Sequence, residues 1–329
     1  MAGTSTEVNG TKNPYLFIVG CPRSGTTLLR RVLDAHPSIA ITTRETHWVP
    51  TVFSDKEGLT PDGFVTPELI PKLLANPRFL KLGIPPQALM KLTESPEPIH
   101  YARFVTGVFD LYGEAQKKPL VGDKTPGYVR QLSLLHTLWP TARFVHLIRD
   151  GRDICLSVMD WKDKAQKFDR RFPTWSEDPI STAALWWKWH VDLGRQAGRS
   201  LGPKLYYEVR YESLVNNPLQ ECMALCRFLG VPYSDSMIRF HEGRTRAKPG
   251  LDAKHAWLPI TSGMRDWRKQ MCDYDVERFE AVAGDLLEEL EYPRASERTR
   301  QAAQMHAAKI CDAFIRNAEL KKQLLPEGW

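Results

Sequence analysis

Short runs of mostly apolar residues occur at three places along the chain, at residues 15–19, 143–148 and 205–209. Such runs, followed by turn or polar residues, are typical of strands buried on both faces of a sheet. Apolar positions spaced by three or four residues follow each run and predict helices over residues 26–35, 154–161 and 219–229. This alternation predicts an α/β fold, in which helices cover both faces of a parallel sheet.

The pattern changes between about residues 50 and 118, where prolines recur between short helical stretches. We interpret this segment as a helical insertion over the carboxyl-terminal edge of the sheet, on the substrate side, and not as a separate domain. Residues 162–180 predict a mobile surface loop that leads into a helix over residues 182–195. That helix carries three tryptophans, which we interpret as core packing.

The two ends of the chain differ from its middle. Residues 1–13 are polar and predict a disordered N-terminus without the apolar core of a secretory signal. Residues 14–294 form the predicted α/β domain. Residues 295–329 predict a helical extension, rich in alanine and charge, that covers the core or contacts a partner. A second copy of the chain is one such partner, and the sequence leaves the oligomeric state open.

Composition disfavours several classes of protein. Of the 329 residues, 42% are hydrophobic and 26% are charged, as in ordinary globular proteins. The formal charge of +6 suits an anionic ligand, but lysines and arginines are spread along the chain, which argues against nucleic acid as a partner. No run of about 18 apolar residues predicts a membrane span. The six scattered cysteines favour reduced thiols over disulfides or a metal site, so we expect a cytoplasmic protein without a metal ion.

The sequence GCPRSGTT, residues 20–27, lies between the first predicted strand and the first predicted helix. Backbone amides at a helix N-terminus bind anions, and the glycines permit close approach. Thr26 stands where the P-loop of nucleoside triphosphatases has its lysine, and no carboxylate for magnesium follows a later apolar run. A ligand with one 5′-phosphate and one attached group needs neither. The candidate anion-binding residues are Arg23, Ser24, Gly25, Thr26 and Thr27.

The stretch PRSGTTLLRRVLDAHP, residues 22–37, resembles the 5′-phosphosulfate loop of the sulfotransferases that use 3′-phosphoadenosine 5′-phosphosulfate (PAPS). It is most similar to the tyrosylprotein sulfotransferase-like branch of that family. The resemblance extends through scattered motifs over most of the chain. It implies a P-loop-like parallel sheet flanked by helices, PAPS as the sulfuryl donor, 3′-phosphoadenosine 5′-phosphate (PAP) as the product, and no metal.

The 3′-phosphate of such a donor requires a second anion site. In RFVHLIRDGRDICLSVMDW, Arg149 ends a predicted strand and Ser157 lies about two helical turns later. Both can reach one phosphate, and the resemblance assigns them to it; alone, Arg149 would indicate an Arg–Asp pair that caps a helix. The resemblance also implies a nucleotide contact from Tyr211, which would otherwise indicate packing. It implies a basic loop over the nucleotide, with Arg265 and Arg268 as the open alternatives.

Sulfuryl transfer to a hydroxyl requires an in-line arrangement, a base, and a cation near the leaving oxygen. VGDKTPGYVR resembles the N-K-D-P block of the family, which implies that Lys124 stabilises the departing phosphate. TTRETHWVP resembles the E-E-T-R segment of the tyrosylprotein branch, which implies Glu45 as the base. This sequence has one extra residue before that segment, and His47 replaces its arginine, so His47 is the alternative base. A purely structural role for Glu45, pairing with Arg44 or Arg23, is the third interpretation.

These features predict an enzyme that moves a sulfuryl group from PAPS to an acceptor hydroxyl by in-line transfer. A P-loop kinase of a small metabolite and a non-catalytic nucleotide-binding relative are the alternatives. The tyrosylprotein relatives act on secreted peptides and carry a membrane anchor; we find none here and therefore expect a small metabolite, lipid or glycan as the acceptor. Apolar contacts in the acceptor pocket are expected from Trp48, Phe53 and Trp175.

Overall fold

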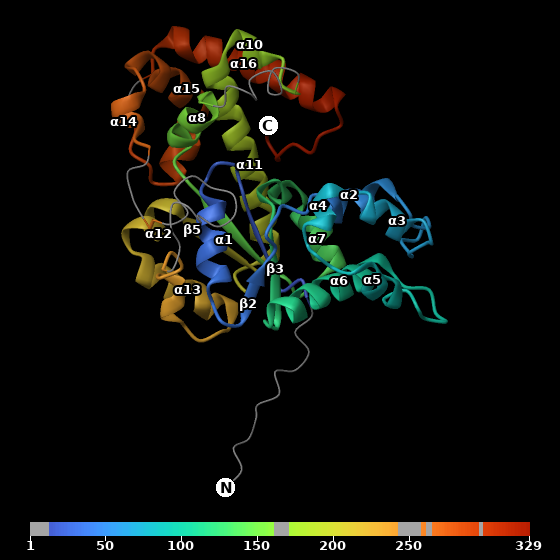
Figure 1. Ribbon diagram of the computed structural model, residues 1–329. Helices are drawn as coiled ribbons and strands as arrows, with labels where there is room; N and C mark the ends of the chain where they lie inside the picture. The colour runs from blue at the N-terminus through green and yellow to red at the C-terminus, as the bar shows by residue number, and fades with distance from the viewer. Residues whose placement is uncertain (1–12, 161–170, 243–257, 261–264, 296–298) are drawn as a thin grey trace.

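The computed structural model describes residues 13–160, 171–242, 258–260, 265–295 and 299–329. Its centre is a parallel sheet of five strands in the order β2-β3-β1-β4-β5 (Figure 1). The strands are β1 (Leu16–Gly20), β2 (Ile39–Ile41), β3 (Leu120–Lys124), β4 (Arg143–Ile148) and β5 (Tyr206–Arg210). The chain fills one half of the sheet through β2 and β3 and then crosses to β4 and β5. The strand order therefore reverses between β1 and β4, a point where α/β sheets bind ligands.

Two apolar clusters on opposite faces of the sheet explain why the central strand, β1, has no polar side chain. Phe17 and Val19 of β1 pack on the face that also carries the insertion. Leu16 and Ile18 pack on the other face with residues of α1 (Thr26–Asp34). Because successive side chains of a strand point to opposite faces, a strand covered on both faces needs an apolar residue at every position. Each such buried side chain contributes about 1.5–3 kcal/mol.

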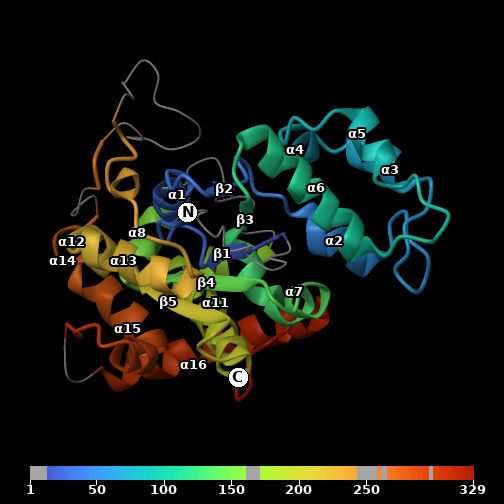
Figure 2. The same cartoon turned by 90° about the horizontal axis from the view of Figure 1, so that it is seen from below.

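The helices of the insertion form a group of their own beside the sheet. Figures 1 and 2 place α2–α6 together on one side, away from α12, α13 and α15. The insertion contains α2 (Trp48–Asp55), α3 (Leu69–Leu74), α4 (Pro77–Leu80), α5 (Pro86–Lys91) and α6 (Tyr101–Gln116). The later helices are η1 (Pro126–Gln131), α7 (Leu132–Leu138), α8 (Gly151–Met159), α10 (Thr174–Glu177), α11 (Pro179–Leu201), α12 (Tyr211–Asn216), α13 (Pro218–Leu229), η2 (Asp235–Met237), α14 (Trp267–Gln270), α15 (Asp273–Glu289) and α16 (Gln301–Leu320).

The sheet and its helical cover confirm the predicted fold class. β4 covers the predicted residues 143–148, and β1 and β5 each lie one residue later than predicted. The sequence analysis did not predict β2 or β3. β2 has only three residues, and β3 ends in a glycine and two charged residues, so neither has the apolar length that indicates a strand.

The prediction of a surface loop over residues 162–180 is wrong for its second half. Residues 161–170 lie outside the described residues, but α10 and the start of α11 fall within the predicted loop. Asp178 explains the early start of α11, because its carboxylate accepts a hydrogen bond from the backbone amide of Ser181 at 3.0 Å and caps the helix. The three tryptophans of this helix are buried in the core, as predicted: Trp186, Trp187 and Trp189.

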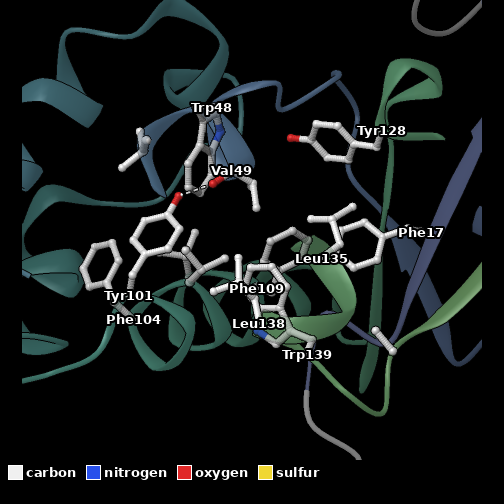
Figure 3. Packing of buried hydrophobic residues seen from close by; sticks show 14 of the residues in the cluster. Phe17, Trp48, Val49, Tyr101, Phe104, Phe109, Tyr128, Leu135, Leu138 and Trp139 are labelled. Atoms are coloured by element: carbon white, nitrogen blue, oxygen red, sulfur yellow. Dashed lines mark hydrogen bonds between the residues drawn. The ribbon is translucent and has the colours of Figure 1, made fainter. Parts of the chain in front are cut away.

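The insertion has a packed aromatic interior (Figure 3). The ring of Trp48 is 3% exposed and lies edge-on to Phe79, while Phe53 stacks on Tyr101. The hydroxyl of Tyr101 donates a hydrogen bond to the carbonyl of Val49 at 2.8 Å. The expectation that Trp48 contacts the acceptor is therefore wrong, because its ring is enclosed by the insertion itself. Phe53 packs against the same cluster, and Trp175 against the cluster of α11 and α15.

The ends of the described chain are packed against the domain. Residues 1–12 of the predicted N-terminal segment lie outside the described residues, but Asn13 is buried and its side chain bonds to Asp110 and to the backbone of Val121. Near the other end, α16 packs against α11 and α15 through Ile310 and Phe314. The C-terminal helix therefore covers the core, which is the first of the two roles expected for it.

Candidate active site

The residues predicted for the site come from the ends of all five strands and meet at the carboxyl edge of the sheet. Parallel strands end at the same edge, so the fold gathers residues that are far apart in the sequence. The contributions, in strand order from β1 to β5, are the loop of residues 20–27, then Glu45 and His47, then Lys124, then Arg149, then Tyr211.

The loop after β1 has an unusual backbone. Gly25, the N-cap residue of α1, has a φ of 103°, and Arg23 has a φ of 81°. A Cβ atom at Gly25 would lie 2.5 Å from a ring carbon of Tyr211, so only glycine satisfies both the backbone angle and the contact. The turn leaves the first amides of α1, which have no partner within the helix, at the edge where an anion binds.

Two buried polar atoms beside this loop have no hydrogen-bond partner among the described residues. They are the hydroxyl oxygen of Ser24, a residue that is 0% exposed, and Nε of Arg149, a residue that is 7% exposed. A buried donor left unpaired costs about 1–3 kcal/mol, so a ligand that accepts hydrogen bonds from these atoms removes that cost. A hydroxyl and a guanidinium are donors that suit phosphate and sulfate oxygens.

Arg149 is held in place from several sides. One terminal nitrogen donates to the carboxylate of Asp153 at 3.1 Å, and the guanidinium lies over the ring of Tyr211, 4.3 Å from its centroid. The carbonyl of Arg149 accepts a hydrogen bond from the indole of Trp187 at 3.1 Å. Since Tyr211 also packs against Gly25, the end of β5 connects the two predicted anion sites.

Three arginines lie close together at this edge. Nε of Arg23 donates to the hydroxyl of Ser157 at 2.9 Å, and Arg265 pairs with Asp160 at 2.7 Å. Burial, together with the charges of Arg265 and Arg149, lowers the pKa of Arg23. The charges of Arg149 and Arg265 thus lie near enough to Arg23 to repel it, and a ligand with several negative charges would relieve that repulsion.

The two C-terminal candidates lie in different surroundings. Arg265 is near enough to Arg23 to affect its pKa. Arg268 is exposed, and its guanidinium lies over the ring of Trp267, 4.5 Å from the centroid. Trp267 is itself buried and donates from its indole to Asp150 at 3.0 Å. The structure therefore brings Arg265, and not Arg268, to the other predicted residues.

Glu45, Lys124 and His47 form one polar cluster on the other side of the loop. Nζ of Lys124 donates to one carboxylate oxygen of Glu45 at 2.8 Å, and Nε2 of His47 lies 2.9 Å from the other. Lys124 is 7% exposed, whereas the side chain of Glu45 is 39% exposed. Each carboxylate oxygen of Glu45 thus has a partner, one in Lys124 and the other in His47.

The electrostatics of this cluster make Glu45 a weak base as it stands. Burial would raise the pKa of Glu45, but the hydrogen bond from His47 and the charge of Lys124 outweigh it and lower the pKa to about 2. His47 also has a φ of 47°, which is uncommon for a residue other than glycine. Backbone strain of this kind clusters at functional sites, where the surrounding structure maintains it.

The sequence analysis missed a set of buried polar side chains next to this cluster. Oγ1 of Thr42 donates to Asp123 at 2.9 Å. The backbone amide of Thr46 donates to Oγ1 of Thr125 at 3.0 Å, and the hydroxyls of Thr46 and Tyr128 are 2.6 Å apart. An aspartate beside a lysine ordinarily indicates a solvated pair, so the pattern carried no signal that Asp123 is buried.

Within the described ranges, no group of three or more His, Cys, Asp or Glu side chains is arranged to hold a metal ion. Helices of the length and apolar character needed to cross a membrane are likewise absent from that part of the chain. All six cysteines are free thiols, as the sequence predicted.

The site is suited to anions because it combines a glycine-containing loop after β1, a lysine at the end of β3 and cations after β4. Comparison with known proteins identifies the family to which this α/β site belongs. A family model described as the sulfotransferase family matches residues 14–235, which is more than half of the chain. The chain therefore belongs to the sulfotransferase family, as the resemblance of its motifs implied.

Two relatives illustrate the similarity. Protein-tyrosine sulfotransferase 2 of Gallus gallus is 27% identical over 237 residues, which cover 72% of this chain and 56% of the relative. The protein-tyrosine sulfotransferase of Drosophila melanogaster is 27% identical over 237 residues, covering 70% and 40%. The chain thus spans about half the length of these relatives. The solved sulfotransferase domain of the Synechococcus PCC 7002 olefin synthase has a TM-score of 0.56 at 22% identity, covering 89% of this chain and 99% of that domain, and shows the shared fold.

Proposed function

We propose that this protein transfers a sulfuryl group from PAPS to an acceptor hydroxyl. The observation that carries the proposal is a juxtaposition at one sheet edge. A cationic cradle with unpartnered buried donors, built on β1 and β4, adjoins a lysine–glutamate pair built on β2 and β3. The first part suits an anionic donor, and the second suits proton removal and leaving-group stabilisation. Membership of the sulfotransferase family supports the same reaction.

The cradle suits the two anionic ends of PAPS. Residues 23–27 would hold the 5′-phosphosulfate, with the Ser24 hydroxyl and the amides at the start of α1 as donors. Arg149 and Ser157 would hold the 3′-phosphate, and Tyr211, which lies under Arg149, would contact the nucleotide. Of the two C-terminal arginines, Arg265 would complete the cradle because it lies near Arg23.

The reaction requires positioning more than covalent chemistry from the protein. The acceptor oxygen forms a bond to sulfur while the bond between sulfur and the bridging oxygen of the 5′-phosphate breaks, and the electron pair of that bond leaves with PAP. Glu45 or His47 accepts the proton of the hydroxyl. Lys124 stabilises the negative charge that develops on the leaving oxygen.

The ion pair between Lys124 and Glu45 suggests how donor binding prepares the base. In the pair, the pKa of Glu45 is about 2, so its carboxylate has little affinity for a proton. When Lys124 turns toward a bound phosphosulfate, Glu45 loses a cationic partner and its pKa rises toward the ordinary value of 4.5. The base thus gains strength only when a sulfuryl group is in place.

For the acceptor, we propose that the phenolic hydroxyl of tyrosine is the first class to test. The relatives described above are named protein-tyrosine sulfotransferases. The sequence-based expectation of a small metabolite, lipid or glycan in the cytoplasm depended on finding no anchor. That ground is weak, because the chain spans about half the length of these relatives. Hydroxyls of those other classes form the second arm of the test.

Binding and turnover test the proposal separately. Calorimetric titration with PAP should give clear binding, and titration with ATP and magnesium should give none, because Thr26 replaces the P-loop lysine. Radiolabelled PAPS should then transfer its sulfuryl group to a tyrosyl peptide, in parallel with a small phenol, an alkyl alcohol and a sugar. Binding of ATP with PAP silent would contradict the proposal and favour the kinase. PAP binding without transfer to any acceptor would favour the non-catalytic relative.

A further inference from the structure

Glu45 and Lys124 lie on two chain segments that are joined on both sides of their ion pair. Residues 42–46 leave the end of β2, and residues 123–125 end β3 and begin the next turn. Before the ion pair, the hydroxyl of Thr42 donates to Asp123; after it, the amide of Thr46 donates to the hydroxyl of Thr125. The ion pair therefore sits between two short polar crosslinks.

Asp123 makes its crosslink from the side of the sheet opposite to Lys124. Side chains alternate along a strand, so Asp123 faces the same way as Val121, which belongs to the apolar cluster under the insertion. Asp123 is 0% exposed in this position. Burial raises its pKa to about 6, although the nearby hydroxyls of Thr125, Thr42 and Thr46 and the charge of Lys124 favour its ionised form.

A buried carboxylate such as that of Asp123 lowers the stability of the folded protein, which suggests that it is retained for a function. Burying a charged group requires several hydrogen bonds or an opposite charge to offset desolvation. Oδ2 of Asp123 accepts its hydrogen bond from Thr42, on the segment that carries the candidate base, whereas Oδ1 is buried without a partner among the described residues. Its neighbour in sequence is the candidate lysine. Groups with such perturbed titration cluster at functional sites. Asp123 itself is enclosed, so it acts through the segments that it joins.

We propose that Asp123 is a positioning residue for sulfuryl transfer. Through Thr42, and together with the contact between Thr46 and Thr125, it holds the segment that carries Glu45 against the end of β3 that carries Lys124, so that the two side chains start from the same place in every molecule. The kinetic consequence of this inference rests on the proposed function, whereas its geometric consequence does not. Each consequence has its own measurement.

The kinetic test compares three variants by kcat with PAPS and a tyrosyl peptide, and by Kd for PAP. Asp123→Ala removes the first crosslink, and we expect kcat to fall about 100-fold, the effect of displacing a reacting group by about 1 Å. Thr42→Val removes the single hydroxyl donor and should lower kcat about tenfold. Asp123→Asn keeps an oxygen that accepts the bond from Thr42 and should restore kcat to within about fivefold of the wild type. The Kd for PAP should change less than about twofold in all three.

Asp178→Asn provides a matched control. Asp178 is also 0% exposed and also accepts a hydrogen bond at its carboxylate, here from the backbone amide of Ser181, but it caps α11 and pairs with Arg278, away from β2 and β3. Its variant should lower the melting temperature and leave kcat per folded molecule within about twofold of the wild type. A loss of folding is thereby separated from a loss of positioning.

Crystal structures of the wild type and of Asp123→Ala supply the geometric test. We expect the contact of 2.8 Å between Lys124 and Glu45 to be lost in the variant. An intact contact with unchanged kcat, or a parallel loss of kcat and PAP affinity, would overturn the inference. If the wild type transfers sulfuryl to no acceptor, the proposed function fails, and the distance in the two crystal structures alone decides whether Asp123 positions the pair.

Discussion

The site has two parts whose charged groups are arranged differently. We call the residues around the loop of residues 20–27 and Arg149 the donor side, and the cluster of Glu45, Lys124 and His47 the acceptor side. On the donor side, Arg149 and Arg265 lie near Arg23, and two buried donors have no partner in the described chain. On the acceptor side, Glu45 is already bonded to both Lys124 and His47. One side is incomplete without an anion, whereas the other has to break an internal contact before it reacts. Substitutions on the donor side should therefore change affinity, and those on the acceptor side should change rate.

The largest effect is expected on the acceptor side. In the proposed reaction, Lys124→Ala removes the cation that stabilises the leaving oxygen, so kcat should fall about 1,000-fold, while the Kd for PAP changes less than about threefold. Steady-state kinetics and calorimetry measure the two quantities. Lys309→Ala, which removes an exposed lysine paired with Glu177, is the control and should change neither. An equal loss of PAP affinity in Lys124→Ala would abolish the distinction between the two sides.

On the donor side, Arg149→Ala should weaken PAP binding about 100-fold, because a buried charged donor is lost. The value of kcat at saturating PAPS should fall less than about fivefold. Arg268→Ala should leave PAP affinity within about twofold, since its guanidinium stacks on Trp267. Equal losses in the two variants would show that Arg268 belongs to the cradle after all.

A smaller effect concerns stability and pH. The pKa of Asp123 is about 6 in the folded protein and near 3.8 when the chain is unfolded, so its contribution to stability is complete below about pH 3.8 and is lost as pH rises through 6. The loss is on the order of 3 kcal/mol. Its titration is coupled to the charge of its neighbour Lys124 and to the phenol of Tyr128. In urea unfolding, the free energy of unfolding of Asp123→Asn relative to that of the wild type should therefore be higher at pH 8 than at pH 5.

Parallel pH profiles for the two proteins would contradict this prediction and would mean that Asp123 keeps an ordinary pKa. The same experiment at high salt serves as a check. Because Asp123 is fully buried, added salt should leave the difference between the two proteins nearly unchanged.

The sequence predicted best those parts of the molecule whose structure depends on residues close together in the chain. β4 is a six-residue strand with one polar interruption, and the loop of residues 20–27 combines glycines, a helix start and anion-binding side chains in eight positions. β2 and β3 escaped prediction because their stability comes from neighbours in the sheet and not from their own length. The buried role of Asp123 escaped for a related reason, since burial depends on an insertion folded elsewhere in the chain.

The candidate site shows the same division. Motifs in the sequence identified residues at all five strand ends, but they left Arg265 and Arg268 as equals. The choice between them depends on how the C-terminal segment lies against α8, where Arg265 meets Asp160. Likewise, Ser157 was expected to act with Arg149, and the structure shows it bonded to Arg23. Contacts of this kind arise only from tertiary packing.

The origin of the site in all five strand ends has a consequence for biogenesis. A partly assembled sheet lacks some of the anion-binding groups, because β5 and the arginine after α13 are synthesised last. PAP should then bind only to the completed domain and draw the folding equilibrium toward it by mass action. Formation of a parallel sheet from distant segments is slow and leaves partly paired edges exposed. PAP would thus act on the nascent chain by stabilising the completed domain over partly assembled sheets.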